Sequence, residues 1–256
     1  MGTEIFSLVG KCAVITGAAQ GIGRAMALEM ANAGAAVACF DVELALAQAT
    51  ADAIKKAGGK AVAIQCDVSS ESAVPLAVAE AHRALGKINV MAHAAAIREP
   101  SGTVLDFDLA TWNKVYAVAV GGAFLMSKAC IPYMKQAGGG SIILIASQLG
   151  SVGAANRPAY CSSKGANIQL AKVLAIDHAA DGIRANSLSP GAVATERLVH
   201  RYGTMDEARR IGGPKHVLGR LGEPEELGRA AVFLASDASS FMTGADLLVD
   251  GGYNAV

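Results

Sequence analysis

In CAVITGAAQGIGRAM, residues 12–26, a short apolar run leads directly into three closely spaced glycines. Gly17 can take a sharp turn, Gly21 lets a phosphate approach the backbone, and Gly23 lets a strand and a helix pack closely. The N-terminus of the following helix would offer free N–H groups and a partial positive charge to a pyrophosphate. The spacing GxxxGxG therefore predicts a dinucleotide-binding turn. The alternative is a tight strand–helix turn without a ligand.

Short apolar runs alternate with longer helical patterns along the rest of the chain. The runs span residues 12–16, 35–40, 61–66, 88–94, 141–146, 183–189 and 246–250. The helical patterns span roughly residues 21–33, 43–57, 71–85, 111–137, 158–180 and 224–236. Because the runs are apolar almost throughout, we expect strands that are buried on both faces, as in a parallel sheet covered by helices. The alternation predicts an α/β fold with an open, doubly wound sheet of about seven strands in a single domain, residues 1–256.

Composition limits the classes of protein to which the chain can belong. Its 256 residues are 52% apolar and 17% charged, which suits a domain with a sizeable core and argues against disorder. The formal net charge is zero, whereas a sequence-independent nucleic-acid binder needs net positive charge. The N-terminal stretch 1–11 lacks the apolar run of a signal peptide, and no charge-free apolar stretch reaches the ~18 residues of a membrane span. We expect neither nucleic acid nor membrane as a partner.

Cysteine usage indicates the compartment. Five cysteines are scattered along the chain without a CxxC pair, which favours a reducing environment. They are Cys12, Cys39, Cys66, Cys130 and Cys161. The sequence therefore predicts a cytoplasmic protein, and no metal site is expected.

An acidic side chain ends the second apolar run, where a dinucleotide fold binds the adenosine ribose. Asp41 in FDVE would accept hydrogen bonds from the ribose diol and repel a 2′-phosphate. No basic residue follows at Val42, and Gln20 in the glycine turn is neutral, so NAD is favoured over NADP. The alternative for Asp41 is the N-cap of the helix at 43–57. Asp67 has two alternatives, a contact with the adenine of the cofactor and a helix cap.

Tyr160 and Lys164, in AYCSSKGA at 159–166, lie four residues apart and share one face of the expected helix. An ammonium beside the phenol, together with the positive charge of NAD⁺, favours the phenolate that a general base requires. Ser147 follows the expected strand 141–146 at the edge where such a sheet binds its ligand. Its hydroxyl would hold a substrate oxygen near Tyr160. Combined with the glycine turn and Asp41, the pair predicts a proton-transfer site.

The chain resembles the short-chain dehydrogenase/reductase family over essentially its whole length. TGAAQGIG (16–23) matches the cofactor motif TGxxxGxG, and Ser147 with YxxxK at 160–164 matches the catalytic residues. SPGAVAT (189–195) matches the PG motif, and VDGGY (249–253) matches the C-terminal end. The resemblance implies a Rossmann-type fold, hydride transfer with a nicotinamide cofactor, and a homotetramer. The small-molecule substrate would be a secondary alcohol, a polyol or a sugar-type hydroxyl.

The motifs, with Asp41 and Asp67, assign three groups of residues in this chain. The cofactor-binding residues are Gly17, Gln20, Gly21, Ile22, Gly23, Asp41, Asp67, Val68, Ala94, Tyr160, Lys164, Pro190, Gly191, Val193 and Thr195. The catalytic residues are Ser147, Tyr160 and Lys164, and the substrate pocket is lined by Ser147, Gln148, Leu149 and Tyr160.

Two departures from the family pattern concern the site. HAAA, at 93–96, stands where the family usually has NNAG, and Ala119 falls on the position of the tetrad asparagine. In the family that asparagine helps to hold a water in the proton relay, partly through its backbone carbonyl, which Ala119 retains. We expect a weakened or rerouted relay. For His93 the alternatives are an adenosine contact and a histidine satisfied at a strand end.

Residues 193–222 interrupt the alternation and predict a segment that covers the substrate pocket. Basic side chains in this segment outnumber its three acids, Glu196, Asp206 and Glu207. The basic residues are Arg197, His200, Arg201, Arg209, Arg210, Lys215, His216 and Arg220. This excess indicates either a cationic lid for a carboxylate- or phosphate-bearing substrate or a solvated helix face.

The favoured function is therefore an NAD-dependent dehydrogenase, with two alternatives. The first is an NADP-linked carbonyl reductase, which Asp41 opposes. The second is a non-catalytic dinucleotide-binding protein, which Ala119 and the HAAA segment favour and the intact Ser147, Tyr160 and Lys164 oppose.

Overall fold

The computed structural model describes residues 4–256, so the first three residues of the N-terminal stretch considered above lie outside the described residues. All seven predicted strands form one parallel sheet, in the order β3-β2-β1-β4-β5-β6-β7. The strands are β1 (Cys12–Thr16), β2 (Ala36–Asp41), β3 (Ala61–Gln65), β4 (Val90–His93), β5 (Gly140–Ile145), β6 (Ile183–Pro190) and β7 (Asp246–Val249). The predicted doubly wound sheet is confirmed. The strand order reverses between β1 and β4, which is where such folds bind their ligands.

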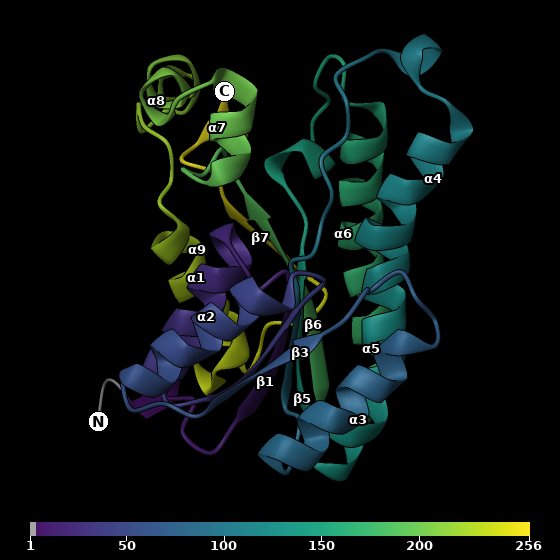
Figure 1. The fold of residues 1–256 in the computed structure, drawn as a ribbon, viewed down its shortest axis with the longest axis vertical. Coiled ribbons are helices and arrows are strands. Elements are labelled where there is room, and N and C mark those ends of the chain that lie inside the picture. The colour runs from purple at the N-terminus through teal and green to yellow at the C-terminus, as the bar shows by residue number, and fades with distance from the viewer. Residues whose placement is uncertain (1–3) are drawn as a thin grey trace.

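Helices cover both faces of the sheet (Figure 1). One face carries α1 (Gly21–Asn32), α2 (Leu44–Lys56) and α9 (Pro224–Ala235). The other face carries α3 (Ala73–Leu85), α5 (Gly122–Gln136) and α6 (Pro158–His178), and α4 (Leu109–Tyr116) packs against α6. Two short helices, α7 (Glu196–Tyr202) and α8 (Met205–Gly212), follow the carboxyl end of β6.

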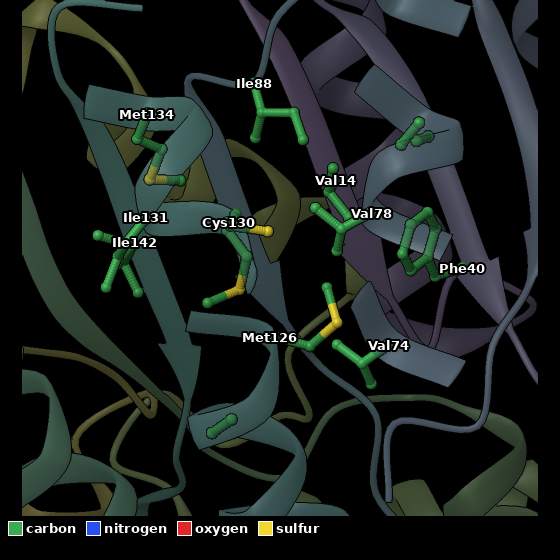
Figure 2. Close-up of a cluster of buried hydrophobic side chains, with 14 of the residues drawn as sticks. Val14, Phe40, Val74, Val78, Ile88, Met126, Cys130, Ile131, Met134 and Ile142 are labelled. Carbon is green, nitrogen blue, oxygen red and sulfur yellow. The ribbon is translucent and has the colours of Figure 1, made fainter. Parts of the chain in front are cut away.

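Successive side chains of each strand point to opposite faces, so the sheet separates two apolar cores. Val14 and Phe40 pack toward α3 and α5, whereas Ala13 and Ile15 pack toward α1 and α9. Figure 2 shows the first core, where Met126 of α5 reaches toward the sheet. Full burial of one side chain of this size contributes about 1.5–3 kcal/mol. Burial on both faces explains why the strand sequences show almost no polar alternation.

The helix expected at 111–137 is present as a continuous helical stretch, Leu109–Gln136, that consists of two α-helical parts. A π-helical turn at Ala117–Gly121 joins α4 to α5. A π turn inserts one extra residue, and π turns occur frequently at functional sites. Taken together, Leu109–Gln136 is long and apolar enough to cross a membrane by length and composition, yet 44% of its most apolar window is buried inside the fold. The stretch packs against α3 and α6, as core helices do.

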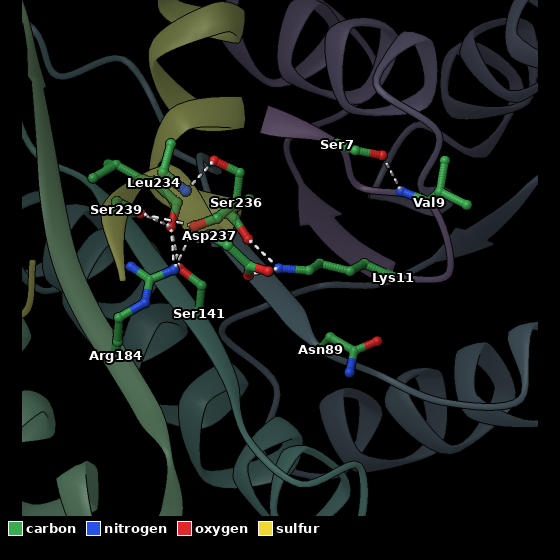
Figure 3. A network of polar contacts seen from close by, with 12 residues as sticks. Ser7, Val9, Lys11, Asn89, Ser141, Arg184, Leu234, Ser236, Asp237 and Ser239 are labelled. Carbon is green, nitrogen blue, oxygen red and sulfur yellow. Dashed lines mark hydrogen bonds and ion pairs between the residues drawn. The ribbon is translucent and has the colours of Figure 1, made fainter. Parts of the chain in front are cut away.

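A polar network fixes the C-terminal end of α9 to the amino ends of the strands (Figure 3). Arg184 at the start of β6 donates a hydrogen bond of 2.9 Å to the Leu234 carbonyl, and the Ser141 hydroxyl donates one of 2.7 Å to the same oxygen. Lys11, just before β1, forms an ion pair of 2.7 Å with Asp237. These contacts lie at the opposite edge of the sheet from the strand ends that carry the predicted site. These contacts therefore stabilise the fold at the end of the sheet that is remote from the predicted site.

The segment 193–222 contains α7 and α8, which the sequence pattern did not predict. Its two ends are held side by side, because Ala194 N–H donates to the Gly222 carbonyl at 2.8 Å and Gly222 N–H donates to the Ala192 carbonyl at 3.0 Å. The segment thus leaves the domain and returns to it at nearly the same place.

Candidate active site

A cavity of about 900 Å³ opens at the carboxyl ends of the strands. Every residue that the sequence assigned to the cofactor, to catalysis or to the pocket lines this cavity. They come from distant parts of the chain, including Gly17 after β1, Asp41 in β2, Ser147 after β5 and Pro190 in β6. The sheet topology alone accounts for this convergence, since parallel strands end at one edge.

The glycine turn has the backbone geometry that the sequence predicts. Gly17 and Gly21 have φ angles of +67° and +56°, in the left-handed region that favours glycine. A Cβ atom on Gly23 would collide with the Gly17 carbonyl, and one on Gly21 would point toward Thr195 Cγ2, 3.4 Å away. The N-cap residue Gln20 makes no side-chain hydrogen bond to α1, so the first-turn N–H groups are available. The turn fits a pyrophosphate.

The two acidic residues are held at the β2–β3 side of the cavity. Asp41 accepts hydrogen bonds of 3.1 Å from the N–H groups of both Ala19 and Glu43, so its carboxylate is fixed beside the glycine turn. The N-cap of α2 is Glu43, which makes no side-chain cap, so Asp41 does not fill the cap position. Asp67 accepts from the N–H and the hydroxyl of Ser69 at 2.9 and 2.7 Å. It stabilises a local turn and also lines the cavity.

Ser147, Tyr160 and Lys164 face the same cavity from two elements. Ser147 follows β5, and its hydroxyl oxygen accepts a hydrogen bond of 3.1 Å from Leu149 N–H. Tyr160 and Lys164 lie in the first two turns of α6, which begins at Pro158, a residue suited to the first helical position. The Lys164 Nζ lies 5.8 Å from the centre of the Tyr160 ring and donates to the Ile145 carbonyl at 2.6 Å. The geometry brings the predicted catalytic residues together.

Burial strongly affects the ammonium of Lys164. This side chain is 3% exposed, and its hydrogen-bond partner is a neutral carbonyl. Burial, with a further contribution from the charge of Arg197, lowers the pKa of Lys164 to about 7. A hydrogen-bonded or anionic group that enters the cavity beside Lys164 would favour its charged form.

Glu99 is a site residue that the sequence analysis missed. Its buried carboxylate follows β4 and accepts a hydrogen bond of 2.8 Å from the Tyr160 N–H, in the first turn of α6. The N-cap residue Arg157 supplies no side-chain cap, so Glu99 satisfies this N–H from a loop 61 residues away. Arg157 lies 3.7 Å from the same carboxylate. The pair fixes the start of the helix that carries Tyr160 and Lys164.

His93 lies at the end of β4 and does not line the cavity. Its Nδ1 is 3.0 Å from the Thr16 hydroxyl and its Nε2 is 3.2 Å from the Val118 carbonyl. Burial, then the charge of Lys164, lowers the pKa of His93 to about 3, so the ring is neutral. The geometry fits a histidine satisfied at a strand end rather than a cofactor contact.

Ala119, at the position of the family's tetrad asparagine, lies within the π-helical turn. Its carbonyl accepts a hydrogen bond of 3.1 Å from the amide nitrogen of Asn167, a fully buried residue one turn beyond Lys164 on α6. The other amide atom, Asn167 Oδ1, has no hydrogen-bond partner among the described residues. No sequence motif indicates Asn167, because only the fold places it opposite Ala119.

Comparisons with known proteins agree with this geometry. The family model described as enoyl-(acyl carrier protein) reductase matches residues 17–254. Two curated relatives are similar over nearly their whole length. A galactitol 2-dehydrogenase (L-tagatose-forming) of Cereibacter sphaeroides is 39% identical, covering 97% of each chain. A cis-4-hydroxycyclohexanecarboxylate dehydrogenase of Sinomonas cyclohexanicum is 38% identical, covering 96% of this chain and 97% of the relative.

The chain belongs to the short-chain dehydrogenase/reductase family. Among solved structures, a gluconate 5-dehydrogenase from Burkholderia cenocepacia in complex with NADP and tartrate superimposes with a TM-score of 0.93 at 32% identity, covering 100% of both chains. The protein is an oxidoreductase of the alcohol-dehydrogenase type that uses a nicotinamide dinucleotide and a small-molecule substrate. The family leaves the choice of dinucleotide open, because that relative was solved with NADP.

Proposed function

We propose that the protein is an NAD-dependent dehydrogenase that oxidises a secondary alcohol, polyol or sugar-type hydroxyl to a ketone and catalyses the reverse reduction. The observation that carries this proposal is the shared cavity, in which Ser147, Tyr160 and Lys164 face the glycine turn and Asp41. The relatives named for galactitol and for a hydroxycyclohexane acid support a hydroxyl-bearing substrate.

Each of the three catalytic side chains has one role in the proposed mechanism. Tyr160 takes the hydroxyl proton during oxidation and returns it during reduction, and it acts within hydrogen-bond reach of the substrate oxygen. Ser147 orients that oxygen and stabilises the charge that develops on it. Lys164 stabilises the phenolate of Tyr160, and its ammonium would hydrogen-bond the nicotinamide ribose when the cofactor is bound. The bound nicotinamide supplies the hydride acceptor or donor.

The preference for NAD rests on Asp41. Its carboxylate is held in place by Ala19 and Glu43 and lines the cavity beside the glycine turn. A fixed carboxylate accepts hydrogen bonds from a ribose diol and repels a 2′-phosphate. Val42 and Glu43, which follow it and also line the cavity, offer no positive charge to a phosphate.

The function is tested by replacing Tyr160 with Phe and following NAD⁺ reduction against a panel of secondary alcohols, polyols and hydroxy acids. Loss of a positioned general acid–base lowers turnover by about 10²–10⁴-fold. Tyr133→Phe is the matched control, because Tyr133 packs against His82 and does not line the cavity. Near-normal turnover by Tyr160→Phe would refute the mechanism. A wild-type protein that binds NADH yet oxidises nothing would indicate a non-catalytic binder, and preference for NADPH would indicate a carbonyl reductase.

Assembly and location are further parts of the proposal. We propose a cytoplasmic homotetramer, in which apolar side chains that this chain exposes are covered by other copies. Val173 and Ile176 of α6 are 51% and 78% exposed, and Phe124 of α5 is 53% exposed. The five cysteines are free thiols, and four of them are buried, which suits a reducing compartment.

A further inference from the structure

The cavity is divided by charge. On the side of β2 and β3 it is lined by carboxylates, Asp41, Glu43 and Asp67. On the side of Tyr160 it is lined by the guanidinium groups of Arg157, Arg197 and Arg201, with Arg98 also on the wall. Formal net charge over the chain is zero, so this separation is a local feature of the site.

The arginines of segment 193–222 fall into two groups. Those beyond α7 are paired with carboxylates on the surface, in Arg209–Glu223, Arg210–Glu207 and Arg220–Glu226, at 2.9, 2.7 and 2.7 Å. His216 is buried. Arg197 and Arg201 on α7 face the cavity, and neither lies within 4.0 Å of a carboxylate among residues 4–256. Only this second group is free to bind an anion.

Arg197 lies directly at the proposed catalytic residue. Its guanidinium carbon is 5.1 Å from the centre of the Tyr160 ring, and its Nη2 donates a hydrogen bond of 3.2 Å to the Ile97 carbonyl. This bond uses one of five guanidinium N–H groups, so donors remain for a ligand. A substrate whose hydroxyl meets Tyr160 would therefore place its neighbouring atoms beside Arg197.

The three guanidinium groups also repel one another. The charges of Arg201 and Arg197, after burial itself, lower the pKa of Arg157, and Glu99 is the one carboxylate that opposes them. The pyrophosphate of the cofactor does not neutralise this cluster, because the glycine turn and α1 hold it elsewhere. Glu196 does not neutralise it either, since its carboxylate is directed at Gly21. A substrate anion would relieve the repulsion.

Resting on the proposed function, we propose that the natural substrate is a hydroxy acid, whose carboxylate is bound by Arg197 and Arg201 while its hydroxyl meets Ser147 and Tyr160. Arginine binds carboxylates through two parallel hydrogen bonds, so it fixes orientation as well as charge. The separation between Tyr160 and the two arginines would then select substrates by the distance between their hydroxyl and carboxylate groups.

The test compares hydroxy acids with their neutral carboxamides, for example 3-hydroxybutyrate with 3-hydroxybutyramide and gluconate with gluconamide. We expect kcat/KM for an accepted acid to exceed that for its amide by at least about tenfold, with a KM that rises with salt for the acid alone. Arg197→Gln should lower kcat/KM for the acid by about 10–100-fold, mainly through KM, and should lower kcat/KM for the amide by a much smaller factor. Arg210→Gln, a surface change in the same segment, is the control.

Binding is measured separately through the fluorescence of NADH bound to the enzyme. Tighter binding of the acid than of the amide, lost in Arg197→Gln, supports the proposal even where turnover is slow. The proposal is overturned if the wild type binds and oxidises the acid and the amide equally well. It is also overturned if Arg197→Gln lowers kcat/KM by the same factor for both, and in either case the dehydrogenase function stands. Absence of any oxidised compound refutes the proposed function instead.

Asn167 carries a second, independent inference, which also rests on the proposed function. The tetrad asparagine of the family is replaced by Ala119, and the amide of Asn167 reaches the Ala119 carbonyl from the opposite helix at 3.1 Å. Asn167 is fully buried, and its Oδ1 is unpartnered. A buried amide oxygen without a partner destabilises the fold unless a water or another donor reaches it.

We infer that Asn167 is a positioning residue that takes over the role of the missing asparagine. It fixes the Ala119 carbonyl in the π-helical turn, and its Oδ1 accepts a hydrogen bond from the relay water near Lys164. The asparagine of this chain thus lies on α6, opposite the π-helical turn that carries Ala119. The relay would be rerouted rather than lost.

The test is a reciprocal exchange. Asn167→Val should lower kcat by about tenfold with KM nearly unchanged and shift the pH profile of kcat, because the relay water loses the acceptor that positions it. The double variant Ala119→Asn with Asn167→Val restores the family arrangement and should recover kcat to within about threefold of wild type. Ser127→Ala, which removes a buried 2.8 Å hydrogen bond to the Ala123 carbonyl away from the cavity, controls for loss of a buried bond. An Asn167→Val enzyme with normal kcat and pH profile, or a folded double variant without recovery, overturns the inference.

Discussion

At the scale of single residues, the proposed preference for NAD over NADP depends on Asp41. Its carboxylate is held by two backbone N–H groups and cannot turn away from an incoming 2′-phosphate without losing both. Asp41→Asn keeps the shape, removes the charge and should narrow the preference for NAD over NADP by about 10–100-fold, as expected when one charge–charge repulsion in a cleft is removed. The ratio of kcat/KM with the two cofactors measures this. Asp67→Asn, which changes a carboxylate bonded mainly to Ser69, is the comparison, and an unchanged ratio for Asp41→Asn would contradict the role.

His93 makes stability depend on pH. Its folded-state pKa of about 3 lies below the ordinary value of 6.5, so the unfolded chain binds more protons between these values. The contribution of neutral His93 is fully present above pH 6.5 and is lost as pH falls toward 3. Urea unfolding at pH 7, 5 and 4 should show a steeper loss of stability for the wild type than for His93→Asn, which cannot be protonated. Parallel pH curves for the two proteins would contradict this.

At the scale of elements, the N-terminus of α6 depends on a residue outside it. Glu99→Ala leaves the Tyr160 N–H and Arg157 without their partner, at a cost of about 1–3 kcal/mol in unfolding free energy. We also expect a lower kcat, because Tyr160 is then held less firmly. Glu71→Ala, which removes a carboxylate that is 4.0 Å from Lys128 on the surface, should change neither stability nor kcat measurably. Denaturant unfolding measures the change in stability of the two variants, and steady-state kinetics measure the change in kcat. Equal values for Glu99→Ala and Glu71→Ala would contradict the prediction.

Strands and long helices follow from the sequence, because continuous apolar runs and helical periodicity are one-dimensional signals. The site residues on strand ends, such as Ser147 and Asp41, follow as well, since the topology carries them to one edge. The π-helical turn cannot be predicted from the sequence, because its one extra residue, near Ala119, barely changes the apolar pattern of the helix. The roles of Glu99 and Asn167 cannot be predicted for another reason. Their hydrogen-bond partners, Tyr160 and Ala119, lie 61 and 48 positions away in the sequence, and only packing brings them into contact.

At the scale of the whole molecule, the exposed faces of α5 and α6 predict self-association. Sedimentation velocity should show a species of four times the mass of the chain. Ile176→Glu places a charge on the exposed apolar face of α6 and should shift the protein toward smaller species. Val9→Glu, at an exposed position before β1, serves as the control. A wild-type protein that sediments only as a monomer would contradict the proposed tetramer.

The paired ends of segment 193–222 have a consequence for how new specificities arise. Because Ala194 and Gly222 meet through direct backbone hydrogen bonds, everything between them forms a cassette whose two attachment points coincide. We expect that such a cassette can be exchanged between homologous chains without altering the sheet, as long as Thr195, which lies beside Gly21 of the glycine turn, is retained. A chimera carrying a foreign cassette should keep its dinucleotide and inherit the substrate range of the donor.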